Sequence, residues 1–300
     1  MAERDARSSR SGGDLPRSPP SGAKPRAQKS PYRSRGLASA MAYSNIIYQV
    51  RDRAAWITIN RPEVRNALDV ATKEEMLDAL REAEEDPEVV AVVITGAGDK
   101  SFCAGADLRM FLEMDEGAAR SYLVVTKGLV DRIEGLSKPV LAAVNGHAFG
   151  GGLELVLASD IAIAVEDALL GQTELNVGLI PGAGGTQRLP RHVGIKRAKE
   201  LVFSGRAITA KEAEELGIVN KAVPRPEFQA TVERYLDELR SKSPLLLKFA
   251  KRALNASFRM SFEEGMREES ELFSKCFSTE DQKEGVRAFL EKRKPRWRGR

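Results

Sequence analysis

The sequence predicts an α/β protein in which parallel βαβ units are followed by a helical region. Short apolar runs alternate with helical patterns through the first two thirds of the chain, as a parallel sheet with crossover helices requires. After Gly194 the pattern becomes mainly helical. A length of 300 residues and an apolar content of 42% supply enough material for a buried core.

The first elements are marked by apolar spacing and by proline. Residues 55–60 alternate as a strand does and end at Arg61-Pro62. Residues 72–85 carry apolar side chains at helical intervals, and Pro87 follows them. Residues 89–95 form a continuous apolar run, which is suited to a buried strand.

The next segments continue the alternation of helix and strand. We expect a helix over 117–135, a buried strand over 139–144, the start of a helix over 153–158 and a strand over 161–165. Further helices are expected at 195–203, 209–216, 226–240, 243–256 and 261–275.

Residues 1–42 are predicted to be a disordered basic extension, ahead of a core over 43–240 and a helical region over 241–300. Residues 1–40 are rich in Ser, Arg, Pro and Gly, so they cannot bury enough apolar surface to offset the entropy of ordering. They carry a formal charge of +6, which leaves −2 on the other 260 residues, so the basic balance gives a nucleic-acid partner little support. The segment is interpreted as a transit peptide, as a basic arm for an anionic partner, or as an extension upstream of a true start at Met41.

Several classes of function lack the residue patterns that they need. Cys103 and Cys276 are too few for a disulfide framework, and neither they nor His147 and His192 show metal-ligand spacing. No apolar run approaches the ~18 residues of a membrane-spanning helix. The glycine patterns of dinucleotide and P-loop sites are also absent. We therefore expect no metal and no membrane partner, and a cytoplasmic location, or the mitochondrial matrix if the N-terminal extension is a transit peptide.

Three segments rich in small residues could carry chemistry. Segment 101–108 follows a predicted strand, and segment 145–154 joins a strand to a helix through three consecutive glycines, whose amides can face a ligand. Segment 171–189 contains a glycine-rich turn that should open a helix. Glu154 and Glu174 stand twenty residues apart in the second and third segments. Two carboxylates that share one water can add it to a carbon–carbon double bond. Taken alone, each segment also fits tight packing or a solvated acid.

These three segments, in this order, resemble the crotonase superfamily and, within it, the enoyl-CoA hydratases. The resemblance extends from about Ile47 to Gly299 and rests on the motifs at 103–107, 149–154 and 180–189, which are specific together. It implies a spiral of ββα repeats with a C-terminal helical trimerisation region, in homotrimers often paired into homohexamers. It also implies an acyl-CoA thioester substrate, with coenzyme A as part of the substrate and no separate cofactor.

The resemblance assigns roles to individual residues. Glu154 and Glu174 would be the catalytic acid/base pair, the amides of Ala104 and Gly151 would form an oxyanion hole, and Gly182 would help to position the water. The acyl pocket would draw on residues 109–123, where Met110, Phe111 and Met114 fall. Substrate and CoA contacts are implied for Arg65, Ala104, Gly105, Ala106, Asp107, Phe289 and Lys292.

The predicted reaction is syn addition of water to a 2-enoyl-CoA, which gives a 3-hydroxyacyl-CoA. The presence of both glutamates favours hydration, because isomerases on this scaffold often need only one carboxylate. Isomerisation and hydration of a branched methylglutaconyl-type substrate stay open as alternatives on the same scaffold. A different class, RNA binding, would use the basic N-terminal arm and the basic run at 293–298.

Overall fold

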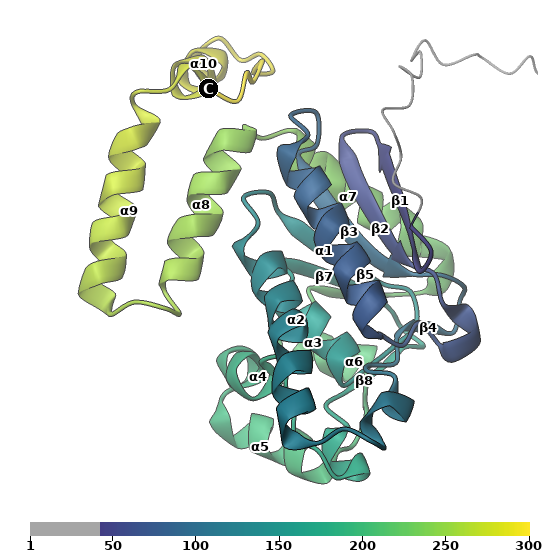
Figure 1. The fold of residues 1–300 in the computed structure, drawn as a ribbon. Coiled ribbons are helices and arrows are strands. Elements are labelled where there is room, and N and C mark those ends of the chain that lie inside the picture. Colours follow the sequence, from purple (N-terminus) through teal and green to yellow (C-terminus); the bar gives the residue numbers. More distant parts are fainter. Residues whose placement is uncertain (1–42) are drawn as a thin grey trace, which may run out of the picture. The chain divides into compact units, whose positions relative to one another are not determined.

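The structure is a computed structural model that describes residues 43–300. The predicted basic extension over 1–42 lies outside the described residues. The described residues belong to one compact unit, which Figure 1 shows as stacked sheets and helices followed by three further helices. The expected boundary between residues 240 and 241 stays a prediction.

The larger of two sheets has six strands in the order β1-β2-β3-β5-β7-β10. These are β1 (Ile46–Arg51), β2 (Ala54–Ile59), β3 (Ala91–Gly96), β5 (Val140–Val144), β7 (Ile161–Val165) and β10 (Lys221–Val223). The β1–β2 pair is antiparallel, and every other neighbouring pair is parallel. β3 and β5 are almost wholly buried, because helices cover a parallel sheet.

The smaller sheet shows that the fold is a spiral of ββα units. Its strands are β4 (Ser101–Cys103), β6 (His147–Phe149), β8 (Leu169–Gly171) and β9 (Ile208–Thr209). Each of the pairs β3–β4, β5–β6 and β7–β8 gives one strand to each sheet and is followed by a helix. The predicted α/β class and the crotonase-like spiral are therefore confirmed.

Three of the core helices, α1, α2 and α6, begin at a side-chain N-cap. The core helices are α1 (Val70–Glu85), α2 (Glu116–Gly135), α3 (Gly151–Ala158), α4 (Gly185–Val193), α5 (Ile195–Ser204), α6 (Ala210–Glu215) and α7 (Arg225–Arg240). The Asp69 side chain accepts a hydrogen bond from the Thr72 amide, and the Asp115 side chain accepts one from Ala118, as N-cap residues do. Three short 3₁₀ turns complete the core: η1 (Pro62–Val64), η2 (Leu108–Phe111) and η3 (Glu174–Val177).

Two buried asparagines tie the loops together where the parallel strands end. Asn66 donates hydrogen bonds to the carbonyls of Ala97 and Ser101. Asn145 accepts a hydrogen bond from the Gly96 amide and donates to the carbonyls of Gly96 and Gly98. Both side chains satisfy backbone groups of the β3–β4 loop that would otherwise be buried without partners. This fixes the start of segment 101–108.

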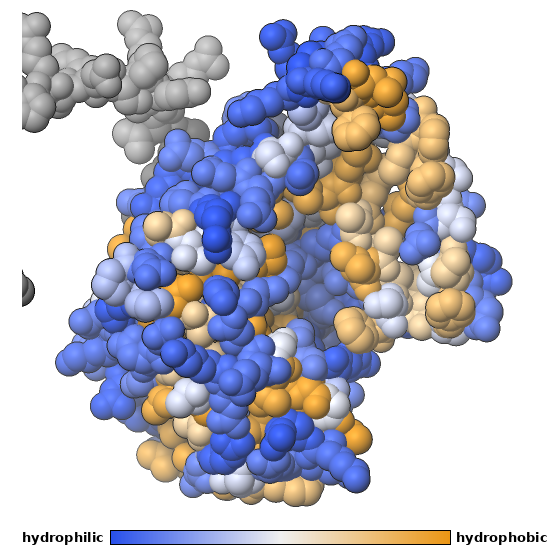
Figure 2. Space-filling model, turned by 180° about the vertical axis from the view of Figure 1, so that it is seen from behind, coloured by the Kyte–Doolittle hydropathy of each residue, from blue (hydrophilic) through white to orange (hydrophobic). Residues whose placement is uncertain are grey.

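The C-terminal region consists of α8 (Pro244–Ala256), α9 (Phe262–Cys276) and α10 (Glu280–Leu290). Helix α8 is tied to the core by Lys251, whose ammonium donates to the Asp160 carboxylate at 2.7 Å. Figure 2 shows apolar side chains gathered over these helices. The exposed members include Leu254, Phe258, Phe262, Phe273, Phe277, Phe289 and Leu290.

The long helices predicted from the sequence agree with those in the structure. The expected helices over 72–85, 117–135 and 243–256 end within two residues of α1, α2 and α8. The strands β4, β6 and β8 were not expected, because three residues are too few to show an alternating pattern. Helix α10 was also missed. Within residues 43–300, no helix has the length and apolar character that crossing a membrane demands.

Helix α3 packs so closely on β4 that only glycine fits at position 152. A Cβ added to Gly152 would lie 2.1 Å from the Cys103 carbonyl oxygen, a backbone atom that cannot give way cheaply. We expect Gly152→Ala to lower the free energy of unfolding by about 3 kcal/mol. Gly128→Ala is the control, since that added Cβ meets nothing within 4 Å and removes a helix-destabilising glycine from α2. Urea unfolding measures both, and equal stabilities would contradict the close packing.

Candidate active site

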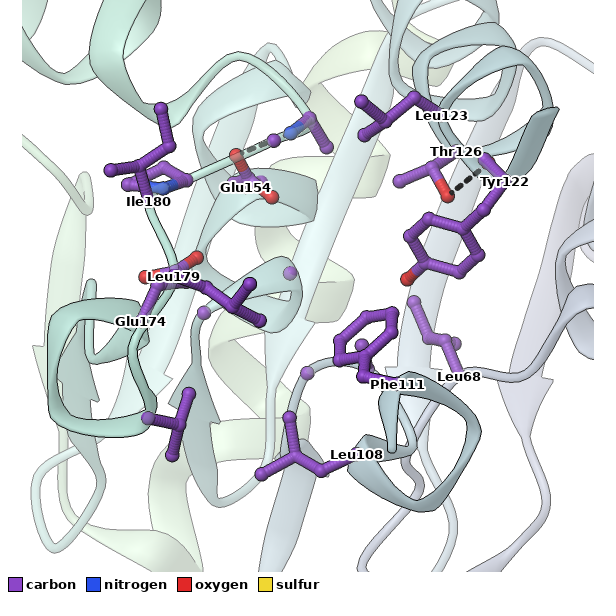
Figure 3. A pocket seen from close by; sticks show the side chains of 18 of the residues that line it. Leu68, Leu108, Phe111, Tyr122, Leu123, Thr126, Glu154, Glu174, Leu179 and Ile180 are labelled. Atoms are coloured by element: carbon purple, nitrogen blue, oxygen red, sulfur yellow. Dashed lines mark hydrogen bonds between the residues drawn. The ribbon is translucent and has the colours of Figure 1, made fainter. Parts of the chain in front are cut away.

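A cavity of about 540 Å³ lies between α2, α3, η3 and the turn ahead of α4. Figure 3 shows Glu154 and Glu174 on one side of it and Tyr122, Thr126 and Leu68 on the other. The cavity thus brings together all three sequence segments that were expected to carry chemistry. Its lining includes the predicted site residues Ala104, Gly105, Ala106, Gly151, Glu154, Glu174 and Gly182.

The Glu154 carboxylate is buried and held by backbone amides. Its side chain comes from the first turn of α3 and is 3% exposed. The carboxylate oxygen Oε1 accepts hydrogen bonds of 2.8 Å from the amides of Ala183 and Gly185. Burial raises the pKa of Glu154 to about 7, the nearby Glu174 carboxylate adds to the rise, and the two amides oppose it. Near neutral pH this group can therefore hold or release a proton.

The Glu174 carboxylate is oriented by a side-chain amide. Gln172, itself buried, donates from Nε2 to both carboxylate oxygens, at 3.0 and 3.2 Å. Burial raises the pKa of Glu174, and the Gln172 hydrogen bond opposes the rise. Gly150, at φ +50°, leaves room for this side chain, because a Cβ there would lie 3.2 Å from the Glu174 Oε1 atom. Sequence reasoning did not identify Gln172.

The backbone amides at the cavity require a correction to the expected oxyanion hole. The Ala104 amide donates to the Arg65 carbonyl oxygen at 3.1 Å, so its hydrogen is already engaged. Among the described residues, neither the Ala106 amide nor the Gly151 amide has an acceptor. These two segments touch, since a Cβ added to Gly151 would lie 3.8 Å from the Ala106 nitrogen. Ala106 therefore suits the role that the sequence assigned to Ala104.

The rest of the cavity is mainly apolar. Leu108, Phe111 and Met114 line it from η2 and the loop after it, as expected for the acyl side, whereas Met110 does not. Helix α2 adds Tyr122 and Leu123, and the turn ahead of α4 adds Leu179, Ile180 and Pro181. One basic side chain, Lys73 of α1, also reaches this lining.

A second cavity, of about 460 Å³, adjoins the first at Ala104 and is lined by charged side chains of both signs. Arg65, Lys100 and Arg225 line it together with Asp99 and Asp167, and Arg225 pairs with Asp167 at 2.7 Å. Arg65 thus lines a cavity next to the first one, and its contact with coenzyme A stays a prediction. The other charged groups of this cavity were not anticipated, because they come from separate segments of the chain.

Three residues implied in substrate binding lie elsewhere or have other partners. Asp107 accepts hydrogen bonds from the Arg109 backbone and side chain, which lower the pKa of Asp107 to about 2, and it caps η2. Phe289 and Lys292 lie at the end of α10 and line neither of the two cavities. Within one chain, the structure does not bring these last two residues to the site. Among the described residues, no cluster of His, Cys, Asp and Glu could hold a metal ion.

A ββα spiral that encloses the buried Glu154 and the partly buried Glu174 beside open backbone amides is the arrangement of the crotonase superfamily. Comparison with known families identifies one family within this superfamily. The model of the enoyl-CoA hydratase/isomerase family matches residues 50–300. The chain belongs to this family.

Individual relatives agree with this assignment. The short-chain-enoyl-CoA hydratase of Clostridium acetobutylicum is 44% identical over 85% of this chain and 97% of its own length. The crotonyl-CoA hydratase of Syntrophomonas wolfei is 43% identical over 85% of this chain and 98% of its own. The crystal structure of an enoyl-CoA hydratase from Bacillus anthracis is 39% identical and superposes with a TM-score of 0.82, covering 86% of this chain and 100% of the other.

The raised pKa of Glu154 has a measurable effect on stability. Between pH 4.5 and 7 the folded protein holds a proton on Glu154 that the unfolded chain releases, so this group makes the fold less stable as pH rises. Glu154→Gln removes that effect. We therefore compare the free energies of unfolding of the variant and the wild type. We expect the difference, variant minus wild type, to increase by on the order of 2 kcal/mol between pH 5 and pH 8. Urea unfolding at both pH values tests this, and a difference that stays constant would contradict it.

Proposed function

We propose that this protein hydrates 2-enoyl-CoA thioesters to 3-hydroxyacyl-CoA by syn addition of water. The observation that carries the proposal is the pairing of Glu154 and Glu174 in one largely apolar cavity, on the same side of it (Figure 3). Both carboxyl groups have raised pKa values, as acid/base catalysts working near neutral pH require. The names of the hydratase relatives support the same reaction.

The proposed mechanism uses the two glutamates and two main-chain donors. The thioester carbonyl oxygen accepts hydrogen bonds from the amides of Ala106 and Gly151, which stabilise the negative charge that builds on it by ~3–4 kcal/mol per donor. A water lies between the carboxyl groups of Glu154 and Glu174. One carboxylate takes a proton from the water while the water oxygen bonds to carbon 3. The other carboxyl group donates a proton to carbon 2. Gly182 is proposed to help hold the water.

The second cavity is proposed to take the charged part of coenzyme A. Arg65 and Lys100 supply positive charge for phosphates beside the acyl cavity, whereas Arg225 in the same lining is paired with Asp167. This suits a ligand that is apolar at one end and anionic at the other. Gly105 and Ala106 would follow the thioester arm. No separate cofactor is proposed, since the two carboxyl groups and the amides supply each group that the reaction needs.

Self-association is proposed through α8, α9 and α10. The apolar side chains that these helices expose are more than a monomer ordinarily leaves in water (Figure 2). A homotrimer, or two stacked as a homohexamer, would cover them and could bring Phe289 and Lys292 of one copy to the CoA site of another. A cytoplasmic location is proposed, with the mitochondrial matrix as the alternative, because relatives of both origins match.

The alternative functions have less support. Isomerisation would leave one of the two cavity glutamates without a role. RNA binding through the basic run 293–298 is disfavoured because Arg293 pairs with Glu284 and Glu291, and Arg298 pairs with Glu280. Paired cations have less charge to offer to phosphates. The basic arm lies outside the described residues.

The proposed acid/base roles predict large losses of activity. We expect Glu154→Gln and Glu174→Gln each to lower kcat for crotonyl-CoA hydration by ~10²-fold or more, measured as loss of ultraviolet absorbance. Glu166→Gln is the control, because Glu166 pairs with Lys211 and lines neither cavity. Near-normal turnover in both cavity variants would refute the assignment.

A further inference from the structure

Lys73 occupies a position where a lysine is unexpected. It lies in the first turn of α1, on the helical face that carries Met76 and Leu80, and Lys73 is only 1% exposed. Lysine is almost never fully buried unless it is paired. The side chain of Lys73 extends to the lining of the catalytic cavity. It is the one Lys or Arg in that lining among the described residues.

Among the described residues, the Lys73 ammonium has only neutral groups in direct contact. Its Nζ donates to the Thr126 hydroxyl at 2.7 Å and lies 3.6 Å from the centre of the Tyr122 ring, a cation–π contact. The Thr126 hydroxyl in turn donates to the Tyr122 carbonyl oxygen, so that Thr126 is already satisfied. Within the part of the chain that the structure describes, no carboxylate lies within 4 Å of Lys73. An ammonium carries three donors, and at least one of these has no hydrogen-bond acceptor here.

This group lies at the acyl side of the cavity, away from the catalytic carboxylates. Figure 3 shows its partners Tyr122 and Thr126 across the cavity from Glu154 and Glu174. The neighbouring wall is apolar, with Leu68 and Leu123. A straight hydrocarbon tail would leave the ammonium buried and unpaired, which is costly. A tail that ends in a carboxylate would supply the missing partner.

We propose that Lys73, with Thr126 and Tyr122 beside it, is a subsite for the far end of the acyl group, and that the protein prefers 2-enoyl-CoA thioesters whose tail ends in a carboxylate. The inference rests on the proposed hydration and names its substrate class. The carboxylate would receive a charge-assisted hydrogen bond from Lys73, the stronger kind inside a protein. Lys73 would thus determine specificity without taking part in proton transfer.

The charge state of Lys73 gives the subsite a pH dependence. Burial lowers the pKa of Lys73 to about 7, and Cys103 on β4, Asp69 ahead of α1 and Glu154 on α3 oppose the change. Tyr122 of α2 also faces it, and burial raises the pKa of that phenol to about 12, which keeps it neutral. The ammonium is therefore present below about pH 7 and is lost as pH rises, so the preference for a carboxylate tail should weaken above neutral pH.

The test compares matched thioesters that differ only at the tail. One pair is 2-hexenoyl-CoA and 2-hexenedioyl-CoA, and a second pair has five carbons. For each pair the ratio of kcat/KM, carboxylate-ended over methyl-ended, is measured for the full chain. We expect Lys73→Met to lower this ratio by about 10- to 100-fold. Lys127→Met is the control and should leave the ratio unchanged, because Lys127 is 69% exposed, pairs with Asp131 and does not line the catalytic cavity.

A second arm measures the same ratio as a function of pH. In wild type the ratio should fall at least several-fold between pH 6 and pH 9, while in Lys73→Met it should stay flat. Titration of Glu154 and Glu174 affects both thioesters of a pair and cancels in the ratio. A wild-type ratio that is independent of pH and equal to that of Lys73→Met would overturn the subsite. If no thioester is hydrated at all, including crotonyl-CoA, then the proposed hydration itself fails, which is a distinct result.

Discussion

The burial of the Glu154 carboxylate is the constraint on which the site depends. Removing this charge from water is costly, and the amides of Ala183 and Gly185 offset part of that cost through two hydrogen bonds of 2.8 Å. Those bonds join α3 to the turn that opens α4, so one interaction fixes both the catalytic group and the wall beside it. The residual cost appears as a raised pKa, which is the property that acid/base chemistry near neutral pH uses.

The sequence predicted the class of fold because its long elements carry strong periodic signals. Helices α1 and α2 have a buried apolar stripe, and β3 and β5 are continuous apolar runs. The smaller sheet could not be predicted in the same way, since its strands have two or three residues each. Those strands are specified by packing between repeats, which leaves no local pattern.

The site was predictable where chemistry is carried by a side chain in a distinctive motif. Glu154 and Glu174 could be named for that reason, and the structure places both in the cavity. Main-chain donors were harder to assign, because the spacing of small residues does not reveal that the Ala104 amide is bonded to Arg65. Lys73 left a faint signal, since it falls on the apolar face of α1 with Met76. An isolated lysine there is easily taken for a surface residue.

In the ββα spiral, the catalytic groups and the facing wall of the cavity come from different repeats. The glutamates proposed to act on the double bond come from α3, which follows β6, and from η3, which follows β8, whereas the wall facing them belongs to α1, α2 and η2. Replacing residues on that wall would leave the hydrogen bonds around the two carboxyl groups untouched. One scaffold can in this way diversify the molecules it accepts while its reaction is inherited unchanged. Selection can act on the two halves almost independently.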